Sequence, residues 1–302
     1  MIRFGLCCIF KEENIKFRRT TAKYLSSLPR VNQLKRLSEI CLFNILSLKQ
    51  ALIFCRDHGI GDFRINSQIL PLKTHPEVGY DIHELPDEEK IMNAFSNCRQ
   101  FSRANDIRTG FHPDQFIVLS SPRPEVVRRS VADLVYQAEV SQLVGSDVIN
   151  IHGGGVYGDK TTALERLVKE IKTLPDHVRK RLTLENDDRS YTPDDLLPVC
   201  IKTGVPLVYD IHHHRCLKDG LNEKEATQAA LSTWNREPLF HISSPRNGWD
   251  NKDIRKHHDY IDPSDFPAYW LPLDITVEVE AKAKELAVTK LINDLKKQKG
   301  SL

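Results

Sequence analysis

The chain has 302 residues, of which 40% are hydrophobic and 28% are charged, and its formal net charge is +2. These values are typical of a folded globular protein and exclude an intrinsically disordered chain. The small net charge neither requires nor excludes a nucleic-acid partner. No apolar run is long enough to span a membrane, and the first apolar run is too short for a secretory signal, so we expect no membrane association.

Seven cysteines are spread along the chain: Cys7, Cys8, Cys41, Cys55, Cys98, Cys200 and Cys216. Their number is odd, and no two of them have the Cys-x-x-Cys spacing of a zinc or redox motif. We interpret them as reduced thiols, mostly buried, in a cytoplasmic protein.

Short apolar runs alternate with segments of helical periodicity along the whole chain. Eight runs are predicted as strands, at residues 3–9, 62–66, 108–112, 147–152, 181–186, 206–211, 238–243 and 273–279. Several are apolar almost without interruption, as strands are when both faces of a parallel sheet are covered. Amphipathic segments between them repeat with the period of a helix, at residues 33–58, 125–145, 162–174 and 223–234.

Eight successive strand-then-helix units predict an α/β fold, a single (β/α)8 TIM barrel, rather than an open sheet. No linker or change of composition divides the sequence, so residues 1–302 are expected to form one domain, with a flexible tail at 293–302. One further helix is predicted to begin at Pro193, with Thr192 as its N-cap and Asp195 in the place of a capping box.

Polar side chains gather where the predicted strands end. In this kind of barrel the carboxyl ends of the strands form one rim, and the active site lies there. Six consecutive strands, the third to the eighth, each bring a histidine or a carboxylate to that rim. Any one of these residues has an ordinary structural explanation, but six coincident placements predict a shared site.

Imidazole and carboxylate groups together are typical ligands of zinc, manganese or iron. The rim has more of them than one ion needs, which indicates two or three ions with Glu185 as a bridging carboxylate. Such a cluster suits the hydrolysis of phosphate esters, because metal ions lower the pKa of water and neutralise the entering and leaving oxygens. We interpret the three glycines at 153–155, after His152, as letting the backbone approach the metal site or the substrate closely. The sequence has neither a Gly-x-Ser-x-Gly nucleophile motif nor a P-loop lysine.

At these motifs the sequence resembles the UV damage endonuclease family, whose members are TIM barrels related to endonuclease IV and the xylose-isomerase-like enzymes. The likeness extends from Arg3 to about Ile292. It is carried by the order and spacing of several segments, at 64–72, 74–77, 112–116, 121–125, 150–154, 184–187, 210–214, 241–244, 257–261 and 280–285.

The resemblance implies cleavage of DNA immediately 5′ of UV lesions, and in some members at abasic sites, by three metal ions that are usually manganese. Magnesium and zinc are the alternatives to manganese. The ligands that it implies are His112, His152, Glu185, Asp210, His213, His241, His257 and Glu280. His257 is preferred to His258, and Glu280 to Glu278, from their places in the family's motifs, and both alternatives stay open. Glu185 is implied as catalytic, and His75 as a further catalytic residue of the pocket, although a loop histidine before a proline is more often structural.

The family also inserts a Gln-Tyr pair into the duplex opposite the lesion. The corresponding pair is Gln115-Phe116, in which Phe116 keeps the stacking surface and loses the hydroxyl group. Packing in the core is the alternative for Phe116. From Lys11 to Arg36 there are eight Lys or Arg against two Glu, and this segment either contacts DNA phosphates or is a solvated helix surface. The residues expected to hold the DNA backbone are Lys11, Lys16, Arg18 and Arg19.

The resemblance therefore implies double-stranded DNA with UV lesions as the partner of a monomer in a bacterial-type cytoplasm, associated with the nucleoid through its substrate. Two positions depart from the family. Leu239 stands where the family has a lysine, two residues before His241, and Leu6 stands where the family has a tyrosine in the lesion pocket. The first departure affects the expected pH dependence, and the second affects the lesion spectrum. Two other functions stay open: a sugar isomerase or epimerase on the same barrel, and a damage-recognition protein without catalysis.

Overall fold

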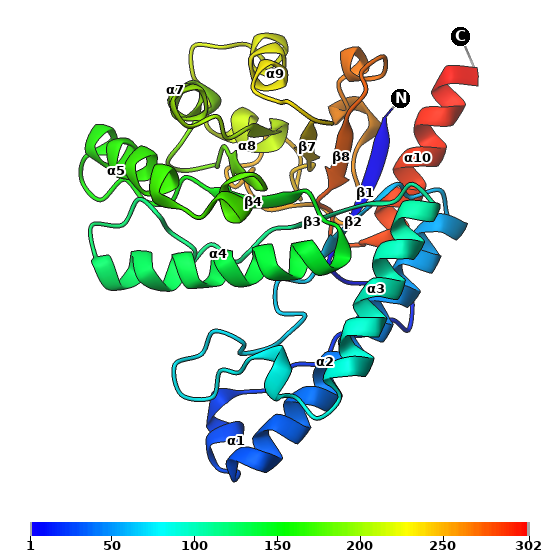
Figure 1. Ribbon diagram of the computed structural model, residues 1–302. Helices are drawn as coiled ribbons and strands as arrows, with labels where there is room; N and C mark the ends of the chain where they lie inside the picture. The colour runs from blue at the N-terminus through cyan, green and yellow to red at the C-terminus, as the bar shows by residue number, and fades with distance from the viewer. Residues whose placement is uncertain (1, 301–302) are drawn as a thin grey trace.

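The structure is a computed structural model that describes residues 2–300. Eight parallel strands close into a barrel in the order of the sequence, with β8 paired to β1 (Figure 1). The strands are β1 (Arg3–Cys7), β2 (Asp62–Ile65), β3 (Arg108–Phe111), β4 (Val148–His152), β5 (Leu182–Glu185), β6 (Leu207–Asp210), β7 (Leu239–Ile242) and β8 (Thr276–Val279). The predicted (β/α)8 barrel is confirmed.

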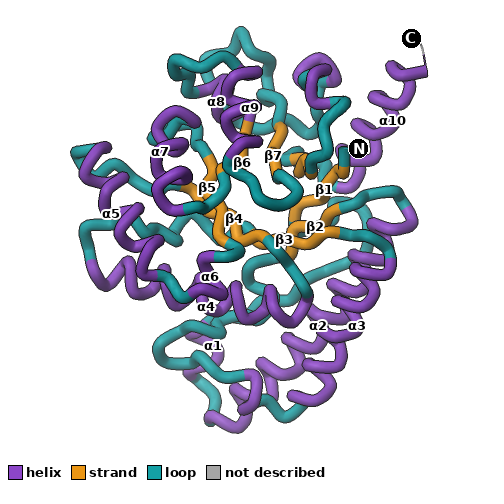
Figure 2. Tube along the Cα trace, turned by 45° about the horizontal axis from the view of Figure 1, so that its top comes forward, coloured by secondary structure: helices purple, strands orange, loops and turns teal. Residues whose placement is uncertain are grey.

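Helices surround the ring of strands (Figure 2). They are α1 (Ala22–Ser26), α2 (Arg30–Asp57), α3 (Glu88–Ala104), α4 (Pro124–Val144), α5 (Lys160–Thr173), α6 (Asp176–Arg179), α7 (Pro193–Thr203), α8 (Ile211–Cys216), α9 (Glu223–Ser232) and α10 (Glu285–Gly300). Short 3-10 turns lie at Ile82–Glu84, Pro263–Asp265 and Ala268–Trp270. The four predicted helical segments correspond to α2, α4, α5 and α9.

Most strands are shorter than the apolar runs that predicted them. At β6 the reason is local: Asp210 caps α8 by accepting the backbone N–H of His213, so Ile211 begins a helix instead of extending the strand. The start of α7 agrees with the sequence, because Pro193 is its first residue and Thr192 and Asp195 form the capping box.

Helix α2 is long and apolar enough, by length and composition alone, to cross a membrane, so the expectation that no stretch reaches that length is too strict. However, 56% of the most apolar 18-residue stretch of α2 is buried inside the protein, and a buried core helix can have the same length and composition. At the other end of the chain, the segment 293–302, expected to be a flexible tail, is helical as far as Gly300, with Leu295 buried, and residues 301–302 lie outside the described residues. All seven cysteines are free and five are buried, as expected.

Candidate metal centre

The carboxyl ends of β3 to β8 and the loops that follow them bring seven of the eight expected ligands together. These seven form three groups of three, in each of which one ligand atom per residue lies within 4.8 Å of the others. The groups are His112–His152–Glu185, His112–His241–Glu280 and Glu185–Asp210–His213. Within residues 2–300 no other group of His, Cys, Asp or Glu meets this criterion.

Glu185 is the fully buried centre of this arrangement. Its Oε2 lies 2.9 Å from Nε2 of His112, and its Oε1 lies 3.3 Å from Nδ1 of His213 and 3.2 Å from Nδ1 of His241. Burial raises the pKa of this carboxyl group, but the imidazoles of His241, His152 and His112 outweigh burial and hold the pKa well below its ordinary value. Glu185 is therefore an anion that faces several imidazoles, as a bridging ligand must be.

Asp210 and His213 are placed by the helix turn that follows β6. One oxygen of Asp210, Oδ1, accepts the backbone N–H of His213 at 2.7 Å, which leaves Oδ2 for another partner. Burial lowers the pKa of His213, but Asp210 and Glu185 raise it well above its ordinary value. The turn thus directs one carboxylate oxygen and one imidazole to the same point.

Four buried polar atoms of the expected ligands lack a hydrogen-bond partner among the described residues: His152 Nδ1, Glu185 Oε1, Asp210 Oδ2 and His241 Nδ1. The two imidazole nitrogens near Glu185 Oε1 are close enough for charge attraction but are not aligned for hydrogen bonds. Buried polar atoms without partners are rare because they lose hydration without compensation. Four such atoms that converge on one place, all of ligand types, fit divalent metal ions.

The geometry favours His257 over His258 as the histidine that faces the site. Nδ1 of His257 lies 3.8 Å from Oε2 of Glu280 and 3.3 Å from the hydroxyl of Ser243. The side chain of His258 is exposed, and its Nδ1 accepts the backbone N–H of Tyr260 at 3.0 Å. His257 belongs to none of the three groups, so its role as a ligand stays a prediction.

Glu278 and Glu280 project into the barrel from the same strand face and meet the same guanidinium, that of Arg64 on β2. Nη1 of Arg64 lies 2.7 Å from Oε1 of Glu280, and its Nε donates to Oε2 of Glu278 at 2.7 Å. Burial raises the pKa of Glu278, but Arg64 and His241 outweigh burial and lower the pKa to about 2. Glu280 belongs to a ligand group and Glu278 does not, which favours Glu280 as the ligand. Arg64 was not among the expected site residues, because its only signal in the sequence is a charge inside an apolar strand.

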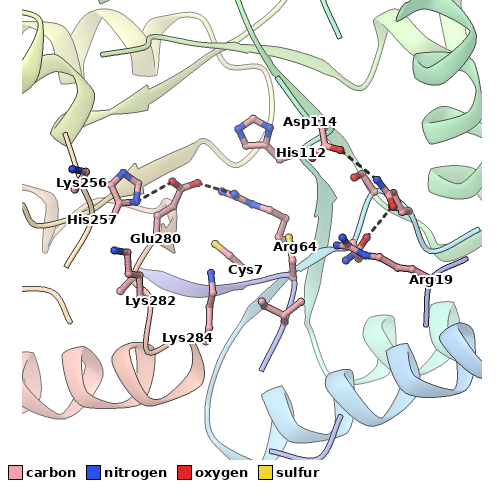
Figure 3. A pocket seen from close by; sticks show the side chains of 16 residues that line it. Cys7, Arg19, Arg64, His112, Asp114, Lys256, His257, Glu280, Lys282 and Lys284 are labelled. Carbon is pink, nitrogen blue, oxygen red and sulfur yellow. Dashed lines mark hydrogen bonds and ion pairs between the residues drawn. The ribbon is translucent and has the colours of Figure 1, made fainter. Parts of the chain in front are cut away.

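A cavity of about 440 Å³ opens beside the ligands (Figure 3). His112, His257 and Glu280 form part of its wall, and Cys7, Cys8 and Ile9 line it from the end of β1. Its basic lining residues are Arg19, Arg64, Lys256, Lys282 and Lys284. Of these, only Arg19 was among the residues expected to contact a substrate.

The sequence profile of the family described as UV-endonuclease UvdE matches residues 2–301. The chain belongs to this family. A UV DNA damage endonuclease from Bacillus velezensis is 34% identical over 297 residues, which cover 93% of this chain and 89% of that protein. The crystal structure of SacUVDE has a TM-score of 0.87 at 29% identity and covers 99% of both chains. Endonuclease IV from Thermus thermophilus shares the fold, with a TM-score of 0.64 at 15% identity over 99% of this chain and 100% of that one.

The two departures from the UvdE family pattern have different structural settings. Leu239 is 3% exposed and packs with Val148, Val208 and Trp234. It therefore makes an apolar contact two residues before His241. Leu6 is fully buried in the main hydrophobic core and does not line the cavity. The residues of β1 and its end that do line it are Cys7, Cys8 and Ile9, so the surface they offer a substrate is small and apolar.

The pair expected to enter DNA lies in the exposed loop after β3. The side chain of Phe116 is 78% exposed, so the alternative of core packing is wrong. Gln115 is also exposed. An exposed aromatic ring on the rim that carries the ligands is available for stacking on a base.

The basic residues Lys11, Lys16, Arg18 and Arg19 are all exposed, and they lie in a loop before α1 rather than on a helix surface. The loop is fixed at two points. The buried carboxylate of Glu285 accepts backbone N–H groups from Lys11 at 2.7 Å and from the next two residues. The side chain of Asn44 accepts the backbone N–H of Arg18 at 2.7 Å. These bonds fix the backbone of the loop, and of its four basic side chains Arg19 lines the cavity.

His75 and the glycines after His152 serve the local structure. Nδ1 of His75 accepts the backbone N–H of Glu77 at 3.2 Å, and no described contact joins His75 to the eight ligands, so its catalytic role stays a prediction. A Cβ atom on Gly153 would lie 2.7 Å from the ring of Tyr191, and one on Gly154 would lie 2.5 Å from the hydroxyl of Ser120. These two glycines make room for neighbouring side chains, and the interpretation that they let the backbone approach the metal site or the substrate stays a prediction.

Proposed function

We propose that this protein is a DNA repair endonuclease that cuts the phosphodiester backbone immediately 5′ of UV photoproducts, with abasic sites as a second substrate. It acts as a cytoplasmic monomer on double-stranded DNA and uses two or three divalent ions, manganese first, with magnesium or zinc as alternatives. The observation that carries the proposal is the convergence of seven His, Asp and Glu side chains around buried Glu185, in a chain of the UvdE family. Relatives named UV DNA damage endonuclease support the substrate.

The residues that would hold the ions are the eight expected ligands. Glu185 would be shared between two ions, because it belongs to two of the three ligand groups. Divalent ions there would supply Lewis-acid help, by lowering the pKa of water and offsetting negative charge on the phosphate. The backbone beside the lesion would be held by Lys11, Lys16, Arg18 and Arg19, while Gln115 and Phe116 enter the duplex. The damaged bases, which stack poorly, would turn into the cavity of about 440 Å³. The products would be a 3′-hydroxyl and a 5′-phosphate.

A sugar isomerase or epimerase would use the same barrel and a similar metal rim, and fold similarity does not separate the two functions. The exposed ring of Phe116 and the anchored basic loop favour DNA, since a small sugar needs neither. A damage-recognition protein without catalysis is disfavoured because seven of the eight expected ligands lie together at the rim.

The proposal is tested by nicking of a duplex oligonucleotide with a single thymine dimer, in Mn²⁺ and in excess chelator, beside the undamaged duplex. We expect manganese-dependent cutting immediately 5′ of the dimer and none in the control. If the folded, metal-loaded protein cuts neither this duplex nor one with an abasic site, the endonuclease function is wrong, and isomerisation of sugars is measured next.

A further inference from the structure

We propose that Lys282 and Lys284 form a phosphate-binding subsite on the wall of the metal cavity, which holds a phosphodiester neighbouring the one that is cut. This inference rests on the proposed function and names two side chains that serve it. Neither lysine belongs to the basic loop before α1. Both line the cavity beside Glu280, and they come from the segment that joins β8 to α10 (Figure 3).

The segment that follows β8 forms a turn before α10 begins. Glu280, Ala281, Lys282 and Lys284 line the cavity, while Ala283 is 6% exposed and belongs to the main hydrophobic core. The segment is also tied to the loop that carries His257, because the backbone N–H of Lys282 donates to the carbonyl of His258 at 3.1 Å. A second such bond joins the next residue to that loop. Two ammonium groups and an expected metal ligand therefore stand on one fixed wall.

Neither ammonium group is neutralised by a carboxylate in an ion pair within residues 2–300. Lys256, on the same cavity, differs because it pairs with Asp253 at 2.7 Å. Unpaired lysines on an open surface are common and need no ligand. Lys282 and Lys284 differ from these because they line a concave site next to expected metal ligands, where a phosphate would approach both.

The backbone at Lys284 gives an independent reason to assign it a function. Its φ is +53°, in the left-handed region that favours glycine and costs other residues stability. Cys8, on the same cavity, has φ +64°, and its backbone N–H donates to the carbonyl of Arg64 at 3.0 Å. Strained residues cluster at functional sites, so a lysine in this conformation on the cavity wall supports the subsite.

An ammonium group is a compact point charge that suits phosphate oxygens and does not read bases. The subsite should therefore contribute equally to damaged and undamaged DNA, and its contribution should fall with salt. Loss of one phosphate contact should weaken binding about five- to tenfold at 0.1 M salt, and should lower the slope of log Kd against log salt by about 1.

The test measures binding of fluorescent duplexes, one with a thymine dimer and one undamaged, by anisotropy over a range of salt concentrations. The full-length wild-type protein is the parent and is loaded with Mn²⁺, and each duplex carries a non-hydrolysable linkage 5′ of the dimer position, so that the DNA stays uncut. Lys282→Ala and Lys284→Gly are compared with Lys202→Ala, an exposed lysine near the C-terminal end of α7, on the opposite face of the barrel. Melting temperature and bound Mn²⁺ are measured for each variant.

We expect both cavity variants to weaken binding of both duplexes by the same factor and to lower the salt slope, while Lys202→Ala has no effect. Lys284→Gly should also melt at the same or a higher temperature, because glycine relieves the strained backbone. Unchanged affinity and slope in both variants would overturn the subsite, as would weaker binding that follows only from lost Mn²⁺ or a lower melting temperature. Failure of the proposed function is seen separately, as a wild-type protein that neither binds nor cuts damaged DNA.

Discussion

The imidazole of His241 is held between two carboxylates. Its Nε2 lies 2.9 Å from Oε2 of Glu278, and its Nδ1 lies 3.2 Å from Oε1 of Glu185. A carboxylate on the outer side of a metal-binding histidine accepts the proton of one nitrogen and so leaves the other free for the metal. Glu278 is therefore placed to orient His241 as a ligand, and Arg64 contacts both Glu278 and Nε2 of His241, the latter at 3.0 Å.

Glu278→Gln should weaken the affinity for Mn²⁺ about 10- to 100-fold, which is the usual effect of losing a group that orients a ligand. The affinity is measured by competition with a chelator. Glu237→Gln, which removes a carboxylate that pairs with Arg3, is the matched control and should leave the affinity unchanged. Loss of one whole ion from the bound metal would instead make Glu278 a direct ligand, and an unchanged affinity would exclude both roles.

Glu185→Gln should lower single-turnover nicking by about a thousandfold or more, which corresponds to about 4 kcal/mol of activation free energy. Glutamine keeps the shape of the side chain but removes the negative charge that belongs to two of the three ligand groups. Rates are measured at saturating DNA and Mn²⁺, and Glu237→Gln again serves as the control. Turnover close to that of the wild type would show that Glu185 is not the bridging carboxylate.

The burial of Asp62 predicts that the stability of the folded protein depends on pH, separately from catalysis. Asp62 is buried, and its Oδ2 has no hydrogen-bond partner among the described residues. Burial raises its pKa well above the ordinary value, and Glu278 raises it further. The folded protein therefore keeps this proton at pH values where the unfolded chain, with a pKa of about 3.9, has lost it. Unfolding releases the proton, so stability falls as pH rises above about 4 until the folded pKa is reached.

Asp62→Asn should remove this fall, because asparagine resembles the neutral form of the carboxyl group. The variant should be more stable than the parent at pH 8 by about 1 kcal/mol or more, and the difference should shrink towards pH 4. Urea unfolding at several pH values measures both curves. A difference that grows as the pH is lowered would have the wrong sign and would contradict the assignment.

The barrel and most of the ligand rim could be predicted because their signals are local. His112, Glu185 and His241 each stand at or directly after the end of a short apolar run, and eight parallel strands in one chain bring such ends to one rim. The start of α7 could be predicted for the same reason, since the residues of its capping box, Thr192 and Asp195, are three residues apart.

The contacts of Arg64 could not be predicted in this way. Arg64 and Glu278 are 214 residues apart, and they meet only because closure of the barrel brings their strands to the same interior. Lys282 and Lys284 look like ordinary solvated lysines in the sequence. Only the folded structure places both of them on the wall of the cavity beside Glu280.

Phe116→Ala should leave stability within about 0.5 kcal/mol of the parent, because the ring is 78% exposed. Stacking of an aromatic ring on a base is worth about 1–3 kcal/mol, so nicking of a dimer-containing duplex should fall about 5- to 150-fold at subsaturating protein. Phe116→Tyr should retain the activity, since it keeps the stacking surface. Ile201→Ala, at a side chain 77% exposed on α7, is the control and should cut normally.

A second substrate separates insertion into the duplex from a general loss of activity. In a duplex that lacks the nucleotides opposite the dimer, no stacked bases need to be displaced, so insertion of the Phe116 ring has little to contribute. The ratio of the parent rate to the Phe116→Ala rate should therefore approach 1 on this gapped substrate. If the Phe116→Ala rate falls by the same factor on the gapped and the intact duplex, the ring contributes through the lesion strand or the loop structure. Insertion of Phe116 into the duplex would then be wrong.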